Sequence, residues 1–487
     1  MTLSLPALPR LPRRVRDQWR RRLTTPTALL GGAVGAGLLA GIGAGRIGVV
    51  LPLAVIVGLS GAGAILRDAR VGLWVALVVI CLLPYATLPV KIGLTFTLLE
   101  LTTLLTLAVL ALRMAYDRTE TVVASPVYLP LGLFAAETVV AFLLGAGRNT
   151  TTQTAHDYVK LMLGVGIFAL IVQLIRTRHE VVALVTTLVT GGAIAGGIGI
   201  ALNRLPVGLT TNLLVRLRVV GYPTDRLVRY IEDDPSLARR ATGTAVDPNS
   251  FAGFLMLVLV LAIGQAVAKR PLIPRPLAIA AVPLSGIALL MTQSRAAALG
   301  AGIGMLILAL ARYRWLVPVL IVGAGGAVLT GRGGFGARLL AGFRGQDAAT
   351  QLRFREFGNA FTLIRDYPVF GVGFGDAPRI DLQTGVSSMY LTVAERAGLV
   401  GLVLFVVLLA VLLGRLLVTS LRVPWNDAGG ELLLAIGAAL AAACTAAVLD
   451  HYFFNLGFAH MAAVFWLLAG LGDVLHRLTI QGRNGET

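Results

Sequence analysis

Arginines are the residues of this chain best suited to chemistry on an anion, and Arg240 and Arg295 stand out because each lies near the start of an apolar run. A guanidinium presents a planar fork of donors that can hold a phosphate through two parallel hydrogen bonds. Arg240 shortly precedes Asp247-Pro-Asn249, where an apolar run begins. A helix start is expected there, because Pro suits the first turn and Asp or Asn can cap free amides. Capping alone can explain Asp247 and Asn249; alternatively, Asn249, Arg240 and the electropositive helix start face an anion together.

Arg295 lies between two apolar runs with almost no loop around it. An arginine close to a membrane core usually faces a partner or an aqueous cavity, although it can also snorkel from a helix end. We favour a ligand-facing role. Arg353 belongs to a stretch, 351–365, that predicts a short surface helix ending before Pro368. Its apolar residues at 354, 357, 361 and 364 share one face, which would lie on the membrane or on the helix bundle.

Candidate groups for proton transfer follow further along the chain. Ser387 is expected to begin or cap the helix that re-enters the membrane, and Glu395 lies two turns later beside Arg396. Glu395 and Arg396 either serve a site or neutralise each other within the bundle. Asp450 and His451 occupy the last outer turn, where His451 is a candidate base or simply a polar residue at a helix end. The other histidines are expected as exposed loop residues (His156, His179), a bundle residue (His460) and a cytoplasmic tail residue (His476).

The elements that must position these residues are membrane helices. The 487-residue chain is 56% hydrophobic, only 14% charged, and has a mean hydropathy of +0.83. Apolar runs of about 18 residues recur from end to end, which is the signature of membrane helices. We predict an all-α polytopic membrane protein with about 12–14 transmembrane helices. Nucleic-acid binding is a poor alternative, because no basic stripe is interleaved with aromatic residues.

The basic residues indicate the topology. If the N-terminus is cytoplasmic, alternating helices put almost every short basic connection in the cytoplasm, as the positive-inside rule requires. Two long loops, 203–248 and 332–388, then face outward, and each carries seven arginines. Arginine on that side suggests an anionic ligand. Codon bias in a GC-rich bacterium explains why the net charge of +18 comes mostly from arginine, but not where the arginines lie.

The predicted organisation has seven segments. They are a basic cytoplasmic tail (1–26), N-terminal transmembrane helices (27–202), an outer loop (203–248), central transmembrane helices (249–331), a large outer loop with a short surface helix (332–388), C-terminal transmembrane helices (389–475) and a cytoplasmic tail (476–487). No convincing metal site is present, since Glu232-Asp233-Asp234 is more simply a solvated acidic turn. We therefore expect neither a metal nor a cofactor.

Four short motifs together resemble the O-antigen ligase and Wzy-type polymerase superfamily of bacterial envelope glycosyltransferases. They are Gly-Thr…Pro-Asn-x-x-Ala at Gly243–Ala252, Ser-Arg-x-x-x-Leu at 294–299, Pro-x-x-Gly-x-Gly at 368–373, and a Ser388…Gly398-x-x-Gly401 spacing. The resemblance covers roughly residues 236–475. Each motif is weak alone, but their order and their placement on outer loops make the set fairly specific.

The resemblance implies a helical bundle like that of the glycosyltransferase-C fold and a metal-independent transferase in the inner membrane. Such a protein takes a glycan from undecaprenyl pyrophosphate and transfers it to a lipid or glycan acceptor hydroxyl at the outer face. By position, Arg240 and Arg295 would clamp the diphosphate and Arg353 would support it. Guanidinium groups stabilise the charge that a diphosphate gains as it leaves. The partners implied are the lipid-linked donor, the acceptor and membrane lipids, and no nucleic acid.

Ser387 departs from the family, which has histidine at this position as the expected base or acceptor-positioning group. Serine is no base near neutral pH without help. The chain is therefore a divergent or polymerase-like member, uses Asp450 or His451 instead, or has lost the activity. The main functional alternative is a transporter or flippase for an anionic lipid-linked polysaccharide. A transporter would be expected to carry charges in broken helices at mid-bilayer, whereas these arginines cluster at the outer face.

Overall fold

The computed structural model describes residues 50–87, 95–117, 121–329, 342, 344–345, 348–378, 381–382, 385–424 and 427–484. The predicted basic tail at 1–26 lies outside these residues, as do the start of the predicted N-terminal transmembrane segment (27–49) and 332–341 of the second long loop. The chain divides into two compact units, residues 1–64 and residues 65–487. The described part of the first unit belongs to α3 (Val50–Arg67), and the second unit holds the other described elements.

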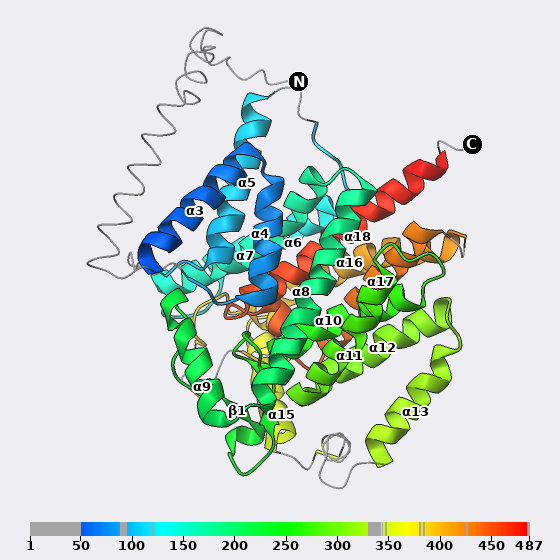
Figure 1. The fold of residues 1–487 in the computed structure, drawn as a ribbon. Coiled ribbons are helices and arrows are strands. Elements are labelled where there is room, and N and C mark those ends of the chain that lie inside the picture. Colours follow the sequence, from blue (N-terminus) through cyan, green and yellow to red (C-terminus); the bar gives the residue numbers. More distant parts are fainter. Residues whose placement is uncertain are drawn as a thin grey trace. The chain divides into compact units, whose positions relative to one another are not determined.

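Helices make up most of the regular structure in the described residues (Figure 1). The N-terminal part contains α4 (Arg70–Leu82), α5 (Leu98–Tyr116), α6 (Tyr128–Leu144), α7 (Thr152–Leu174) and α8 (Arg178–Arg204). The central part contains α10 (Pro248–Val267), α11 (Arg275–Thr292), α12 (Arg295–Ala311) and α13 (Leu316–Leu329). The C-terminal part contains α16 (Met389–Arg422), α17 (Ala428–Ala446) and α18 (Ala459–Asn484). Each of these helices coincides with a predicted apolar run, although α18 continues past the expected start of the tail at 476.

Eight of the described helices are long and apolar enough to cross a membrane: α5, α7, α8, α10, α11, α16, α17 and α18. The shorter helices α4, α6 and α12 are also apolar. The predicted all-α polytopic membrane fold is thus confirmed, while the total of 12–14 spans and the glycosyltransferase-C-like arrangement stay predictions. Helices α10, α17 and α18 form the centre of the bundle. In each of them 83% of an apolar 18-residue stretch is buried, against 39% in α16 and 33% in α11. The central helices therefore pack against protein, and the outer ones leave a face for lipid.

The connections predicted to be cytoplasmic meet at one end of the second unit, where side chains bind the backbone of neighbouring turns. Glu431, which is 2% exposed, accepts hydrogen bonds from the backbone N–H groups of Lys269 and Arg270, each at 2.8 Å. Buried Arg312 donates to the carbonyls of Ser420 and Val423. Other bonds at this end are Arg70 to Glu180 and Arg113 to the Arg67 carbonyl. We call this the interlocked end.

The two long loops lie together at the other end, the loop end. Figure 1 shows α9 (Val207–Val215), β1 (Arg229–Tyr230) and α15 (Ala348–Asp366) on this side. The first loop contains a small antiparallel hairpin of β1 and β2 (Arg239–Arg240), with short 3-10 helices at Arg216–Val220 and Ile231–Asp233. Backbone bonds tie both loops to short turns: Thr87 N donates to Val220 O at 2.8 Å, and Gly147 N donates to Val372 O at 2.6 Å.

Helix α15 confirms the surface helix predicted at 351–365, but its predicted apolar face is not the face that packs on the bundle. Phe354 and Phe361 are 61% and 60% exposed, whereas Ala360 and Leu363 are buried. The helix contacts α16. Packing on the protein alone therefore does not account for the two exposed phenylalanines, and their contact with a membrane stays a prediction.

Candidate functional site

Arg240 is held at the loop end by hydrogen bonds to the start of α10 and to the end of α11. Its Nη2 donates to Asn249 Oδ1 at 2.6 Å, and its Nε donates to the carbonyl of Thr292 at 2.7 Å. Asn249 stands in the first turn of α10, which Asp247 caps by accepting the Ser250 N–H at 2.7 Å. The structure therefore brings Arg240 and Asn249 together, and it confirms the capping role of Asp247. Arg240 also braces the end of α11, three residues before Arg295.

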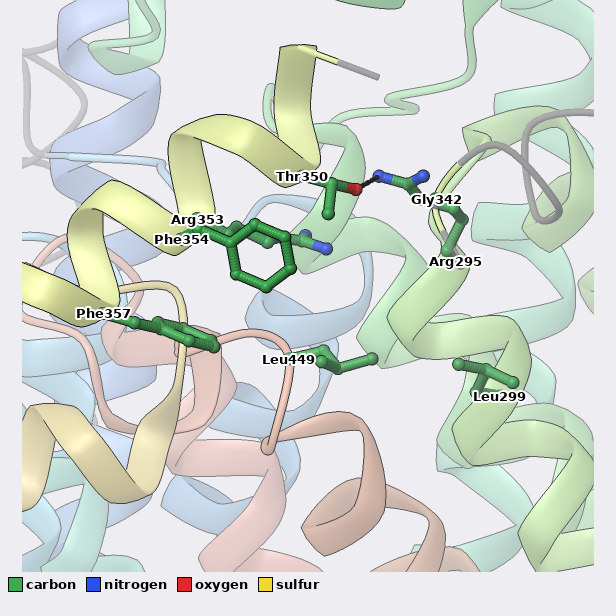
Figure 2. Close-up of a pocket in the computed structure, with 8 residues that line it drawn as sticks. All are labelled: Arg295, Leu299, Gly342, Thr350, Arg353, Phe354, Phe357 and Leu449. Carbon is green, nitrogen blue, oxygen red and sulfur yellow. Dashed lines mark hydrogen bonds between the residues drawn. The ribbon is translucent and has the colours of Figure 1, made fainter. Parts of the chain in front are cut away.

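Arg295 and Arg353 line one cavity of about 230 Å³ at the loop end, which we call the arginine cavity. Arg295 is the first residue of α12, after a reversal at Gln293 with positive φ (59°). Its Nη2 donates to Thr350 Oγ1 at 3.2 Å. Figure 2 shows Thr350, Arg353, Phe354 and Phe357 on α15 facing Arg295 and Leu299 on α12. The remaining lining residues are Gly342 and Leu449. Arg240 is not among the lining residues.

A second cavity of about 230 Å³ lies at the same end, which we call the histidine cavity. Its lining residues are Leu161, Phe374, Gly385, Thr392, Arg396, His451, Phe454, Asn455 and Leu456. The turn Leu449-Asp450-His451 runs between the two cavities, because Leu449 lines the first and His451 the second. This turn therefore forms part of the wall of both the arginine cavity and the histidine cavity.

Asp450 is the buried acid of this turn, with 5% of its surface exposed. Its Oδ1 accepts the backbone N–H of His451 at 2.9 Å and lies 3.9 Å from His451 Nδ1. Burial raises the pKa of the Asp450 carboxyl group above its usual range, because the charged form loses solvation. The charges of His451 and Arg353 oppose this rise, and the charge of Asp247 adds to it. The acid thus lies within electrostatic reach of both the arginine and the histidine.

Ser387 lies close to this turn but does not cap α16. The helix begins at Met389, two residues after Ser387, and Ser388 is in the cap position without a side-chain capping bond. Helix α16 is held instead by Met389 N–H, which donates to the carbonyls of Ala447 and Asp450 at 2.8 and 3.1 Å. The Ser387 backbone N–H donates to Glu356 Oε2 of α15 at 3.0 Å. Three predicted proton-transfer candidates, Ser387, Asp450 and His451, are thus neighbours.

The fourth candidate is Glu395. Together with Arg396 it binds the turn 368–375, which contains the Pro-x-x-Gly-x-Gly motif and which we call the glycine-rich turn. Glu395 is 1% exposed, accepts the Gly385 N–H at 3.1 Å and lies 3.9 Å from Arg396 Nε. Arg396 donates to the carbonyls of Gly373 and Gly375 at 3.2 and 2.7 Å. These contacts favour the interpretation of Glu395 and Arg396 as a pair that stabilises the bundle, although Arg396 also lines the histidine cavity.

Two contributors to the site escaped the sequence analysis. Thr350 binds Arg295, and Glu356 binds Ser387, yet neither had been singled out. The signal for Glu356 was present, because it lies three residues after Arg353 and such residues share a helix face. Thr350 carried no signal, since its partner is far away in the sequence.

No group of three or more His, Cys, Asp or Glu side chains in the described part of the chain is arranged to hold a metal ion. The acidic turn Glu232–Asp234 is exposed, and Asp233 pairs with Arg229 at 3.7 Å. The turn is therefore engaged in a surface ion pair.

Comparison with known proteins gives one family. The model of the O-antigen ligase family matches residues 279–406, about a quarter of the chain. Arg295, Arg353, Ser387 and Glu395 lie inside the match, whereas Arg240, Asn249, Asp450 and His451 lie outside it. No curated protein matches the chain. The match supports the resemblance that the motifs predicted, because residues 279–406 are similar to the O-antigen ligase family.

Proposed function

We propose that this O-antigen ligase-like membrane glycosyltransferase moves a glycan from undecaprenyl pyrophosphate to an acceptor hydroxyl without a metal ion. In this proposal Arg295 and Arg353 hold the diphosphate of the donor. The observation that carries it is the shared cavity: two guanidiniums from α12 and α15 line about 230 Å³ of space at the loop end. Arg240 acts as a positioning residue, because it holds the end of α11 through the Thr292 carbonyl.

The arginine cavity has a basic part and an apolar part, which suit the diphosphate and the lipid of a lipid-linked donor. The guanidiniums offer fork-shaped donors to phosphate oxygens, while Phe354, Phe357, Leu299 and Leu449 give an apolar lining. When the bond from the anomeric carbon to the diphosphate breaks, the leaving oxygen keeps the electron pair. Its negative charge then grows, and fixed positive groups stabilise the transition state more than the bound donor.

The histidine cavity is the proposed site of the acceptor. The acceptor enters from this cavity: its oxygen forms a bond to the anomeric carbon as the bond from that carbon to the diphosphate breaks, and its proton passes to His451. Neutral histidine is the side chain best matched to proton transfer near neutral pH. Asp450 stabilises the imidazolium that forms, because its Oδ1 lies 3.9 Å from His451 Nδ1. His451 thus supplies the base that Ser387 cannot.

The proposal includes the orientation of the chain. Its apolar helices and its family match indicate a multi-pass protein of the bacterial inner membrane. We propose that the loop end faces outward, because the basic connections at the interlocked end obey the positive-inside rule only in that orientation.

The test is release of undecaprenyl pyrophosphate from a lipid-linked glycan by the purified protein. Arg295→Ala and Arg353→Ala should each slow release by about 10²-fold, as expected when one donor to a developing anion is removed. Arg355→Ala is the matched control, since Arg355 is exposed on the same helix and is absent from the cavity lining. Equal losses in all three variants would replace the clamp with general attraction of an anionic substrate. A wild-type protein that consumes no such donor would refute the transferase proposal.

A further inference from the structure

A third cavity lies far from the loop end, between α16, α18 and the segment before α6. It measures about 240 Å³ and is lined by Ala124, Pro126, Arg415, Asp473, His476, Arg477, Ile480 and Gln481. Arg415 lies 17 residues beyond Gly398 on α16, about 25 Å along the helix at 1.5 Å per residue. The cavity therefore belongs to the interlocked end, and the proposed transferase chemistry does not use it.

Several donor groups around this cavity have no hydrogen-bond acceptor within the described residues. They are Arg415 Nε, Arg477 Nη1 and, beside the cavity, Arg176 Nη1, and all three atoms are buried; His476 Nδ1 is also buried without a partner in the described part of the chain. His476 is only 6% exposed, although it was expected in a cytoplasmic tail. Buried donors without acceptors are rare, because each loses its solvation without compensation. A ligand rich in acceptors would satisfy them together.

The charges at this cavity do not cancel. Asp473 is the acid of the lining, and it binds Arg415 at 3.2 Å. Arg477 and Arg176 add positive charge, and the two lie close enough for their charges to interact. Arg176 is held in place by its Nη2, which donates to the Thr121 carbonyl at 3.2 Å. Three arginines thus surround one already paired carboxylate, which favours an anion.

We propose that this cavity binds a phosphate group, such as the headgroup phosphate of an anionic membrane lipid. The donors come from α16, α18 and the connection between α7 and α8, so they approach from several directions and suit a tetrahedral oxyanion. Part of the lining is apolar, with Ala124, Pro126 and Ile480, and Ile480 is 40% exposed. Basic pockets between membrane helices are known to bind such headgroups. The site is independent of the transferase proposal, because it shares no residue with either cavity at the loop end.

The experiment uses the full-length purified protein in detergent and counts bound lipid by native mass spectrometry. Phosphatidylglycerol, phosphatidylcholine and inorganic phosphate are the probes, and melting temperature is the second readout. Wild type should bind phosphatidylglycerol about ten-fold more tightly than phosphatidylcholine. Arg477→Gln and Arg176→Gln should each abolish this preference. Arg422→Gln should retain it, because Arg422 is exposed at the same end but does not line the cavity.

The outcomes separate the sources of the phosphate. A rise in melting temperature with inorganic phosphate alone, lost in Arg477→Gln, would support the phosphate site and exclude the lipid as its required source. Equal binding of the two lipids with no effect of phosphate would overturn the proposal. So would equal losses in Arg477→Gln, Arg176→Gln and Arg422→Gln, since the preference would then reflect only surface charge. Two cavity variants are included so that misfolding of one leaves the other to decide.

Discussion

Asp450 is a residue whose burial works against its own charge. A carboxylate that loses solvation without a full set of donors destabilises the fold when it is ionised. Its folded pKa is raised by burial, so its contribution to stability is largest at low pH and is lost as the pH rises through that pKa. At neutral pH the ionised Asp450 therefore does not stabilise the fold. In our proposal its role is functional, because it supports proton transfer to His451.

Asp450→Asn should therefore separate stability from activity. The variant should melt at the same or a higher temperature at neutral pH, because asparagine carries no buried charge. Its turnover should fall by about 10²-fold or more, the usual contribution of acid–base groups. In the wild type, protonation of Asp450 should contribute to the loss of activity at low pH, at a value above that of an ordinary aspartate, and this contribution should be absent in the variant. Equal losses of stability and activity would make Asp450 a structural residue.

At the scale of elements, the glycine-rich turn and the start of α16 form one unit although they are two separate motifs in the sequence. Val372 N–H and Gly373 N–H donate to the carbonyls of Glu395 and Arg396, and Leu399 N–H donates to the Pro368 carbonyl at 2.7 Å. Gly398 breaks the helix there with φ 67° and ψ −174°, a conformation that is almost exclusive to glycine. The two motifs are thus held together by backbone hydrogen bonds, so their residues have a structural role as well as a possible chemical one.

Gly398→Ala should disrupt this docking. A Cβ at this position would lie 1.9 Å from the Val369 carbonyl oxygen, and the backbone conformation adds strain of about 1–3 kcal/mol. We expect a clear fall in melting temperature together with loss of activity, since Phe374 and Arg396 line the histidine cavity. Gly414→Ala is the control on the same helix. No atom lies within 4 Å of its added Cβ, so that variant should be neutral or slightly stabilising.

The helices could be predicted because the length of an apolar run depends only on consecutive residues. The site depends instead on contacts between segments that are far apart in the sequence. Asp247 shows the first case, since a cap acts on the residue three positions later. His156 shows the second: it was expected in an exposed loop, but it is buried in α7 with Nε2 3.0 Å from Glu100 of α5. The hairpin that presents Arg240 was also missed, because two-residue strands leave no periodic pattern.

At the scale of the whole molecule, the orientation of the chain can be tested with introduced cysteines. Both native cysteines, Cys81 and Cys444, are free and buried, so they should give little background labelling. Ser236→Cys at the loop end should react with a membrane-impermeant thiol reagent in spheroplasts. Arg314→Cys, exposed at the interlocked end, should react only after permeabilisation. The reverse pattern would show that the arginine cavity faces the cytoplasm.

The bonds of the interlocked end have a consequence for the transporter alternative. A carrier must expose its substrate to the two sides of the membrane in turn, which requires both ends of the bundle to open. Opening this end would separate Glu431 from two backbone amides and Arg312 from two carbonyls, and hydrogen bonds to charged groups contribute about 1.5–3 kcal/mol each. We therefore expect the interlocked end to stay closed and any opening to occur at the loop end, which argues against a carrier.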